Sequence, residues 1–336
     1  MHSLLLAMTL GASEAPLFAP PGMVTNDNWF ARDGDTYHAF YLQVPAAAAR
    51  QAAEQRDWSI RAAWSHVGHA TSTDLRHWTD HGPVLVALKG TWNDASIATG
   101  SVVRHAGRWW MVYTGVGRSS GLGLAVSDDL MSWTKVGDGP IVPLGQPFDG
   151  LWEGRALRWT PLADPYLCPE PIGGEYWMVL NSHELGAPLS TGGCLTVLRS
   201  TDLQHWSPGP VLACPGWAER LETPQLWRHG SRWYLYAGVA HDHGVPEAWA
   251  RIAPPAARSW TRINIVLTAE RPEGPFAPAG DWVLALPDGR AGYIHKVMAG
   301  PGGGDVLLST VDGCLSPPYG VSYAADGSLR LAKPEG

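Results

Sequence analysis

The chain has 336 residues with 24 basic and 31 acidic side chains, which give a formal net charge of −7 at pH 7. Because this acidic balance comes without a cluster of Lys or Arg, we expect neither nucleic acid nor an anionic membrane surface as a partner. Hydrophobic residues make up 45% of the chain and include 18 Trp, which is ample for a large core, although length alone does not decide between one domain and two.

The N-terminal end gives a weak targeting signal. The run 4–10 is apolar, but no Lys or Arg occurs before Arg32, and the run is far too short to span a bilayer. We therefore expect a cytoplasmic protein, with secretion as the alternative. The segment 18–23 contains two Pro and predicts an extended entry to the first strand.

The first structural unit begins at residue 24. Asp27 precedes a turn at 33–34 and an aromatic strand at 36–41 that alternates in the β manner. The Ala-rich stretch 46–54 predicts a short helix or loop inserted in this unit. The strand 64–70 that follows is expected to deliver Trp64 and His69 to one edge.

The pattern of the first unit recurs along the chain: an acid, a short apolar strand, a turn with Gly or Asp, and an aromatic strand. The acids are Asp27, Asp94, Asp164, Glu222 and Asp281, and successive members are 67, 70, 58 and 59 residues apart. Such spacing predicts five repeats of one structural unit.

A second phrase, Ser-x-Asp-Leu-x-x-Trp, lies between copies of the first, at 72–78, 127–133 and 200–206. Each copy follows a short apolar run and predicts a turn that leads to a Trp packed between sheets. Because the Asp of this phrase recurs where catalysis needs only one copy, we interpret it as structural.

Several short strands per repeat and a period near sixty predict an all-β fold, a single five-bladed β-propeller over residues 1–336. The blades are expected to start near residues 24, 92, 160, 218 and 279, with a Pro/Gly-rich insertion at 272–280 and no C-terminal β-sandwich. The runs 320–323 and 328–331 are expected to close the ring with the N-terminal segment.

The four cysteines show no metal-ligand spacing. Free thiols are expected, with a disulfide such as Cys168–Cys194 as the alternative in an oxidising compartment. The segment 241–243, His-Asp-His, lacks a third ligand nearby and is interpreted as a polar loop, while His295 is a weaker candidate ligand for an ion in the channel. We predict no metal site and no cofactor.

The predicted propeller places the repeated acids close together. The innermost strands of a propeller line its central channel, so acids at matching positions of different blades meet at one mouth. Crowded carboxylates shift one another's pKa, which can keep one protonated while another stays ionised. Glycosidic-bond cleavage needs such a set.

Five segments occur in the same order in a known family: 25–28 with 37–41, 68–78, 99–101, 163–165 and 222–224. They resemble the catalytic propeller of glycoside hydrolase family 32, which is related to the levansucrase-like (family 68) and arabinanase-like (family 43) enzymes. The resemblance covers nearly the whole chain and implies a five-bladed propeller with an Asp, Asp, Glu triad. It implies that Asp27 is the nucleophile, Asp164 the transition-state stabiliser that holds sugar hydroxyls, and Glu222 the general acid/base, with retention of configuration. If the chain acts like family 43, Asp27 would instead be a base for water and the outcome inversion.

The sequence departs from the family 32 pattern at three points. Asn28 stands where the family has Pro, Ala163 where it has Arg, and Thr223 where it has Cys. Arg155 or Arg158 is expected to supply the missing guanidinium. These departures keep open a propeller that binds sugar without cleaving it.

The predicted substrate-binding residues come from three of the blades. They are Asn26, Gln43, Trp64, Trp92, Asp94 and Arg155. We predict a glycosidase acting on furanosides, with β-fructofuranosides favoured, α-L-arabinofuranosides second, and sugar transfer as an alternative outcome of the same triad. The expected partner is a carbohydrate substrate, and no oligomeric state is predicted.

Overall fold

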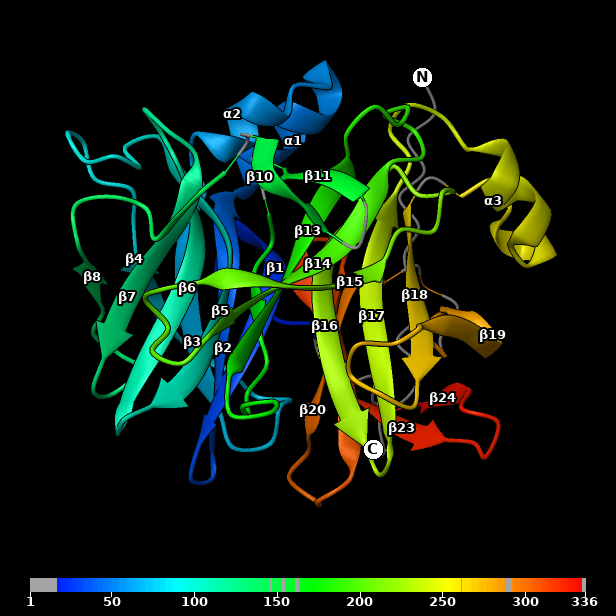
Figure 1. Cartoon of the computed structure of the whole chain (residues 1–336). Helices are drawn as coiled ribbons and strands as arrows, with labels where there is room; N and C mark the ends of the chain where they lie inside the picture. The colour runs from blue at the N-terminus through cyan, green and yellow to red at the C-terminus, as the bar shows by residue number, and fades with distance from the viewer. Residues whose placement is uncertain are drawn as a thin grey trace, which may run out of the picture.

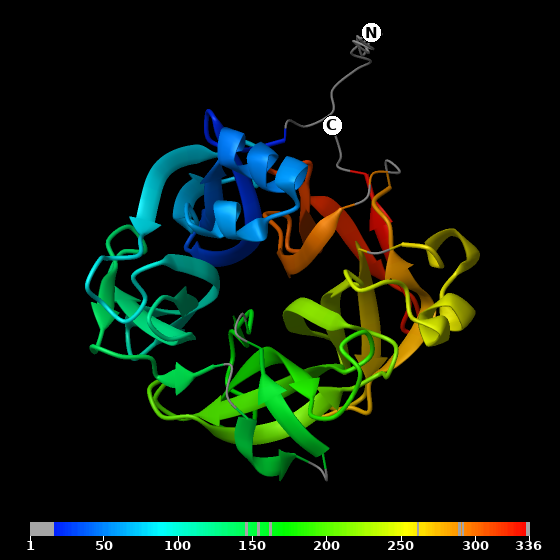
Figure 2. The same ribbon diagram turned by 90° about the horizontal axis from the view of Figure 1, so that it is seen from above.

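The computed structural model describes residues 17–144, 147–152, 155–160, 163–260, 262–287, 290 and 292–333. In this part of the chain the strands form five antiparallel sheets, each built from one continuous stretch of sequence. The sheets stand around a central axis like the blades of a propeller (Figure 1, Figure 2). The predicted five-bladed β-propeller is therefore confirmed.

Each blade is ordered from the axis outward. The first consists of β1 (Met23–Asp33), β2 (Thr36–Pro45), β3 (His66–Ser72) and β4 (Thr79–Leu85). The second consists of β5 (Ser96–His105), β6 (Arg108–Val116), β7 (Gly121–Ser127) and β8 (Thr134–Val136), with β9 (Val142–Pro143) paired to β7. The third consists of β10 (Pro147–Trp152), β11 (Arg155–Trp159), β13 (Tyr176–Glu184), β14 (Gly193–Ser200) and β15 (Ser207–Ala213), with β12 (Tyr166–Leu167) paired to β13.

The last two blades follow the same plan. The fourth consists of β16 (Arg220–His229), β17 (Arg232–Ala240), β18 (Arg262–Ala269) and β19 (Ala277–Leu284). The fifth consists of β20 (Tyr293–Ala299), β21 (Asp305–Val311), β23 (Tyr319–Tyr323) and β24 (Leu329–Ala332), with β22 (Cys314–Leu315) paired to β21.

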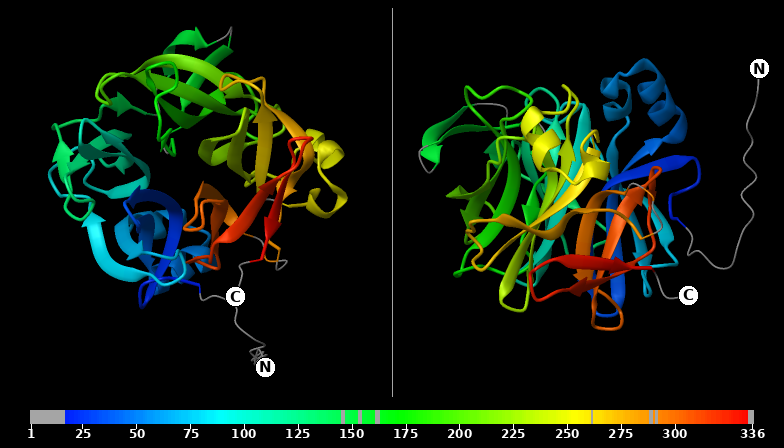
Figure 3. Two further views of the ribbon diagram at one scale, coloured as in Figure 1. Left: turned by 90° about the horizontal axis from the view of Figure 1, so that it is seen from below. Right: turned by 90° about the vertical axis from the view of Figure 1, so that its right-hand side faces the viewer.

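Helices occur only as short insertions among the described residues. They are α1 (Ala46–Gln55), α2 (Trp58–Ala62), α3 (Glu247–Ile252) and a 3-10 turn (Pro255–Ala257). The predicted insertion at 46–54 is therefore a helix. None of the helices in the described ranges is long and apolar enough to cross a membrane. Helices α1, α2 and α3 lie at one end of the ring (Figure 3).

The start of the fifth blade differs from the prediction. Asp281 lies in β19, the outermost strand of blade four, and the inner strand of blade five is β20. The expected start near 279 is therefore wrong, because no acid marks the beginning of β20. Ring closure also differs: Thr25 donates its N–H to the Gly313 carbonyl at 2.7 Å, and Phe18 pairs with Leu315, whereas β23 and β24 form the outer edge of blade five.

The Ser-x-Asp-Leu phrase forms the same turn in each copy. In the second copy Ser127 Oγ accepts the N–H of Leu130 at 2.9 Å, and Asp129 Oδ1 accepts the N–H groups of residues 131 and 132 at 2.8 Å. These bonds hold Leu130, which is fully buried, at a φ of 63° that a branched side chain rarely adopts. Trp133 at the end of the phrase packs edge-on against Phe40 of blade one, so the structural interpretation of this Asp is confirmed.

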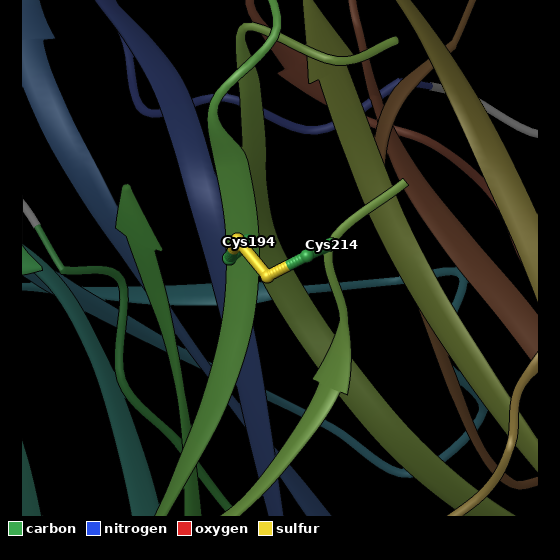
Figure 4. The surroundings of a disulfide bond; sticks show 2 residues. All are labelled: Cys194 and Cys214. Carbon is green, nitrogen blue, oxygen red and sulfur yellow. A yellow bond between two sulfur atoms is a disulfide. The ribbon is translucent and has the colours of Figure 1, made fainter. Parts of the chain in front are cut away.

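The prediction of free cysteines is wrong for two of the four, Cys194 and Cys214. Cys194 of β14 and Cys214, which follows β15, form a disulfide across the third blade (Figure 4). Cys168, buried at 3% exposure, and the partly buried Cys314 are free. Strand pairing explains the choice of partner, because Leu195, next to Cys194, is paired with Ala213, next to Cys214.

Candidate active site

The inner strands share one irregularity that positions the site. A register shift occurs in β1 between Asn26 and Trp29, and the same shift recurs in β5, β16 and β20. Asp27 sits in this bulge at a φ of 45°, and Asp164, in the gap between β11 and β12, has the same φ of 45°. The residue in this left-handed conformation is turned out of the regular alternation of the strand.

Aligning the bulges corrects the register of the acid repeat. Thr223, at a φ of 45°, is the residue of blade four that matches Asp27, and Glu222 lies one position earlier. The matching residue of blade two is Ala98, so Asp94 is not an equivalent of Asp27. Of the five predicted acids, Asp27 lies in a bulge, Asp164 has the same backbone conformation and Glu222 directly precedes a bulge. None of this holds for Asp94 and Asp281.

The bulges lie at the end of the ring that carries the helices. Met23 at the start of β1 pairs with Pro45 at the end of β2, and α1 follows directly. Arg220 at the start of β16 likewise pairs with Ala240, shortly before α3. The three acids therefore lie toward the mouth of the channel on this side of the ring, where they interact with one another, and α1 and α2 cover blade one on the same side (Figure 2).

Asp27 and Asp164 each accept a hydrogen bond from a neighbouring blade. Thr99 Oγ1 donates to Asp27 Oδ2 at 2.6 Å. Asp164, only 7% exposed, accepts the Nδ2–H of Asn181 at 2.9 Å and the backbone N–H of Thr223 at 3.1 Å, both on Oδ2. Blades one and two thus meet at the first carboxylate, and blades three and four at the second.

Burial governs the charge of these two carboxylates. It raises the pKa of Asp27 above its ordinary value, against the bond from Thr99 and the nearby charge of Arg61. It raises the pKa of Asp164 to about 7, and the negative charges of Asp27 and Glu222 add to the effect. The three carboxylates therefore act on one another electrostatically, as the crowding argument predicts.

Glu222 has a different environment. Arg220 Nε donates to Glu222 Oε1 at 2.8 Å, and the Tyr293 hydroxyl donates to Oε2 at 2.5 Å. The guanidinium of Arg262 lies 3.6 Å from the same Oε2. Glu222 is 21% exposed, so this carboxylate faces the mouth while charged and polar donors fix its orientation.

The segment 241–243 supports these arginines. Asp242 Oδ1 lies 3.0 Å from Arg262 Nη2, and Asp242 Oδ2 also pairs with Arg220. His243 Nδ1 lies 2.7 Å from the buried Glu219. The interpretation of this segment as a polar loop is therefore incomplete, because Asp242 also holds the two guanidinium groups beside Glu222.

The predicted binding residues of blade one belong to the end of the ring that carries α1 and α2. Asn26 directly precedes Asp27 and is partly buried. Gln43 is buried, its Nε2 lies 2.8 Å from His66 Nε2, and its Oε1 has no protein partner. Trp64 follows α2 and is 57% exposed.

The other three predicted binding residues differ in their settings. Trp92 stacks on Tyr113 with ring centroids 6.4 Å apart and is partly buried in blade two. Asp94 forms an ion pair with Arg118 at 3.5 Å. The backbone of Arg155 belongs to β11, while its side chain lies outside the described part of the chain. Their roles in substrate binding stay predictions.

Sequence reasoning missed the basic and phenolic residues of the site: Arg61, Arg220, Arg262, Tyr293 and Lys296. Only Arg220 carried a local signal, because residues two apart on a strand share a face and Arg220 lies two before Glu222. His295 contacts Ser309 inside blade five at 2.9 Å, and its neighbour Lys296 lines the channel. In the described ranges, no group of three or more His, Cys, Asp or Glu side chains is placed to hold a metal ion.

The fold and the carboxylates define the class of protein, a propeller of the glycoside hydrolase kind. A thermostable family-43 glycoside hydrolase has a TM-score of 0.65 at 14% identity, covering 93% of this chain and 94% of that one. The sucrose-6-phosphate hydrolase from Lactobacillus gasseri has a TM-score of 0.66 at 19% identity, covering 91% of this chain and 60% of that one. At such identities the likeness shows the fold alone.

The family follows from the sequence. The model of the glycosyl hydrolases family 32 N-terminal domain matches residues 18–226, and the chain belongs to this family. Raffinose invertase of Escherichia coli is 28% identical over 245 residues, which are 69% of this chain and 45% of the relative. Sucrose-6-phosphate hydrolase of Escherichia coli is 30% identical over 229 residues, which are 65% of this chain and 42% of the relative. The matched regions span less than half the length of these curated relatives.

Proposed function

We propose that the protein is a glycoside hydrolase that cleaves β-fructofuranosides. The observation that carries this proposal is the meeting of Asp27, Asp164 and Glu222 from three blades, each in a different environment. Two carboxylates with distinct settings are what acid/base and nucleophilic roles require. Membership of family 32 and relatives named invertase and sucrose-6-phosphate hydrolase support the substrate class.

The settings suggest the role of each carboxylate. Glu222, at the mouth, would donate its proton to the leaving oxygen while an oxygen of Asp27 attacks the anomeric carbon and the glycosidic bond breaks. Water, giving up a proton to Glu222, would then displace Asp27 and release the sugar with retention. Asp164, the most enclosed of the three, would hold hydroxyl groups of the furanose ring.

A second candidate is an inverting α-L-arabinofuranosidase. The full-length likeness of the fold to a family-43 enzyme favours it. In that case Asp27 would activate water rather than attack. Transfer of the sugar to another sugar, and binding without cleavage, remain alternatives that the same experiments separate.

The location of the protein also stays a proposal. The N-terminal sequence favours the cytoplasm, whereas the Cys194–Cys214 disulfide is typical of oxidising compartments. Thiol titration of protein isolated from each compartment under alkylating conditions would decide between them. Cys194 and Cys214 that do not react with the alkylating agent would favour secretion. Four reactive thiols would favour the cytoplasm.

The decisive assay is sugar release from sucrose, raffinose, inulin, levan, sucrose 6-phosphate and arabino-oligosaccharides. We compare the wild type with Glu222→Gln and Asp27→Asn, and use Asp281→Asn as the matched control because Asp281 is exposed on the outermost strand of blade four. Each site variant is expected to lose at least about a thousandfold in kcat while the control keeps full activity. Proton NMR of the first-formed anomer then distinguishes retention from inversion. Binding without release, unchanged in both variants, would refute the proposal in favour of a sugar-binding propeller.

A further inference from the structure

A buried lysine lies on the inner strand of blade five, next to the bulge of blade four. Lys296 of β20 is 5% exposed. It follows the bulge of blade five, and its counterparts in the other blades are Trp29, Gly100, Tyr166 and Gln225. With the exception of Gly100, these residues line one cavity of about 530 Å³ in the channel. Blade five is thus the blade that places a cation at this level of the axis.

The ammonium group of Lys296 holds the bulge that carries the site. Nζ donates to the carbonyl of Thr223 at 2.7 Å and to that of Pro224 at 2.9 Å. These two residues directly follow Glu222, and the N–H of Thr223 donates to Asp164. A single side chain therefore fixes the backbone between two of the three carboxylates.

The surroundings of Lys296 are mostly acidic or aromatic. Asp27 of β1 and Asp164, before β12, attract its charge. The Tyr166 ring centroid of β12 lies 5.5 Å from Nζ, and Glu222 of β16 lies one residue before the bonded bulge. Burial lowers the pKa of Lys296 to about 7 despite the two carboxylates, so its charge depends on their being ionised.

We propose that Lys296 is a positioning residue for the proposed glycosidase reaction. Its hydrogen bonds hold the 223–224 bulge in place, and its positive charge keeps the buried carboxylates usable in their ionised form. Charge and hydrogen bonding are separate contributions, and different substitutions remove them. The inference rests on the proposed function, because the readout is the pH dependence of sugar release.

Three variants separate the contributions. Lys296→Gln keeps a hydrogen-bond donor for the bulge but has no charge, Lys296→Met has neither, and Lys296→Arg keeps the charge. The matched control is Lys135→Met, because Lys135 also bonds a backbone carbonyl, that of Val86 at 2.8 Å, and lies 5.8 Å from a Tyr ring in blade two. The control removes a partly buried lysine of the same kind away from the carboxylates.

The measurement is the pH profile of kcat/KM on the substrate that the wild type cleaves best. Loss of a nearby positive charge raises the pKa of a carboxylate, so the acidic limb is expected to move up by about one pH unit in the Gln and Met variants. We expect kcat to fall at least about tenfold in both, further in Met, with KM changed less than about threefold. The Arg variant and the Lys135→Met control are expected to keep the acidic limb of the wild type.

The outcomes separate the inference from the proposed function. If the wild type and the control cleave sugar and Lys296→Gln shows the unshifted profile of the wild type, the charge of Lys296 has no role and the inference fails alone. If neither the wild type nor the control releases sugar, the proposed function fails and takes the inference with it. Should Lys296→Met not fold, judged by circular dichroism, the comparison of the Gln and Arg variants still decides.

Discussion

Removing the charge of Asp164 is expected to stabilise the protein at the pH where it abolishes activity. Asp164 is 7% exposed and accepts the amide of Asn181 and the N–H of Thr223. Asn at this position has nearly the same shape and keeps an oxygen for both donors. The Asp164→Asn variant therefore tests the charge rather than the packing.

The magnitude follows from the pKa of Asp164. Its rise from 3.8 to about 7 corresponds to an upper limit of about 4 kcal/mol of destabilisation by the ionised carboxylate above pH 7. Removing Asp164 also removes an attractive partner of the buried Lys296, so the net gain expected at pH 8 is about 1–3 kcal/mol. The sign is fixed by proton uptake: the folded protein binds the proton more tightly, so this contribution to stability is complete below pH 3.8 and lost as the pH rises through 7.

Urea unfolding of the wild type and Asp164→Asn at pH 5 and pH 8 measures the effect. The stability gain of the variant is expected to be larger at pH 8 by about 2 kcal/mol, with Asp281→Asn as a control that shows no such difference. Equal loss of stability in the variant at both pH values would mean that the ionised form of Asp164 does not destabilise the folded protein. This result would refute the reasoning. Activity measured in parallel should fall at pH 8 although stability rises, as expected for a functional site that stores unfavourable charge.

Four further changes test other parts of the structure. Arg61→Ala removes a guanidinium that favours the ionised form of Asp27, and steady-state assays should show kcat/KM lowered about tenfold. His69 is fully buried with its pKa lowered to about 3. Its contribution to stability is therefore lost as the pH falls below 6.5, by about 2 kcal/mol at pH 5. In His69→Asn, the urea midpoint should fall less steeply between pH 6.5 and pH 5 than in the wild type. Reduction of the Cys194–Cys214 disulfide, which closes a loop of 20 residues, should lower the free energy of unfolding by about 3 kcal/mol in thermal unfolding. The same loss on reduction is expected in a Cys168→Ser variant, because Cys168 is not part of the disulfide. Ser127→Ala, which deprives the buried turn of its hydroxyl, should cost about 1–2 kcal/mol in denaturant titrations.

The architecture was predictable because its signals are local. A turn such as Ser127 to Leu130 forms its hydrogen bonds within a few residues, so the phrase itself encodes the turn wherever it occurs. The insertion at 46–54 was predictable for the same reason, since an Ala-rich run is a helix former in itself. Repetition of local signals then gave the number of blades.

The register of the acids was not predictable, because a β-bulge leaves no mark in composition. Asp94 and Asp281 stand at the right distances in the sequence, yet neither lies in the bulge of an inner strand. In blade five the bulge residue is Ile294, preceded by Tyr293, so the pattern of acids ends before the last blade begins. Because the connecting loops differ in length, a residue at the expected spacing of about sixty can lie on a different strand of its blade.

Charged residues of blades four and five surround the predicted triad. Position 163 carries Ala where the family has Arg, and this departure was an argument for a propeller that only binds sugar. Arg220 and Arg262 of blade four contact Glu222, and Lys296 of blade five bonds the 223–224 bulge. Apart from Arg220, these cations and the carboxylates come from different parts of the sequence and meet only in the folded ring, so no sequence motif predicts their contacts. Burial and neighbouring charges raise the pKa of Asp27 and of Asp164, and groups perturbed in this way are candidates for catalytic residues, so these surroundings favour catalysis over binding alone.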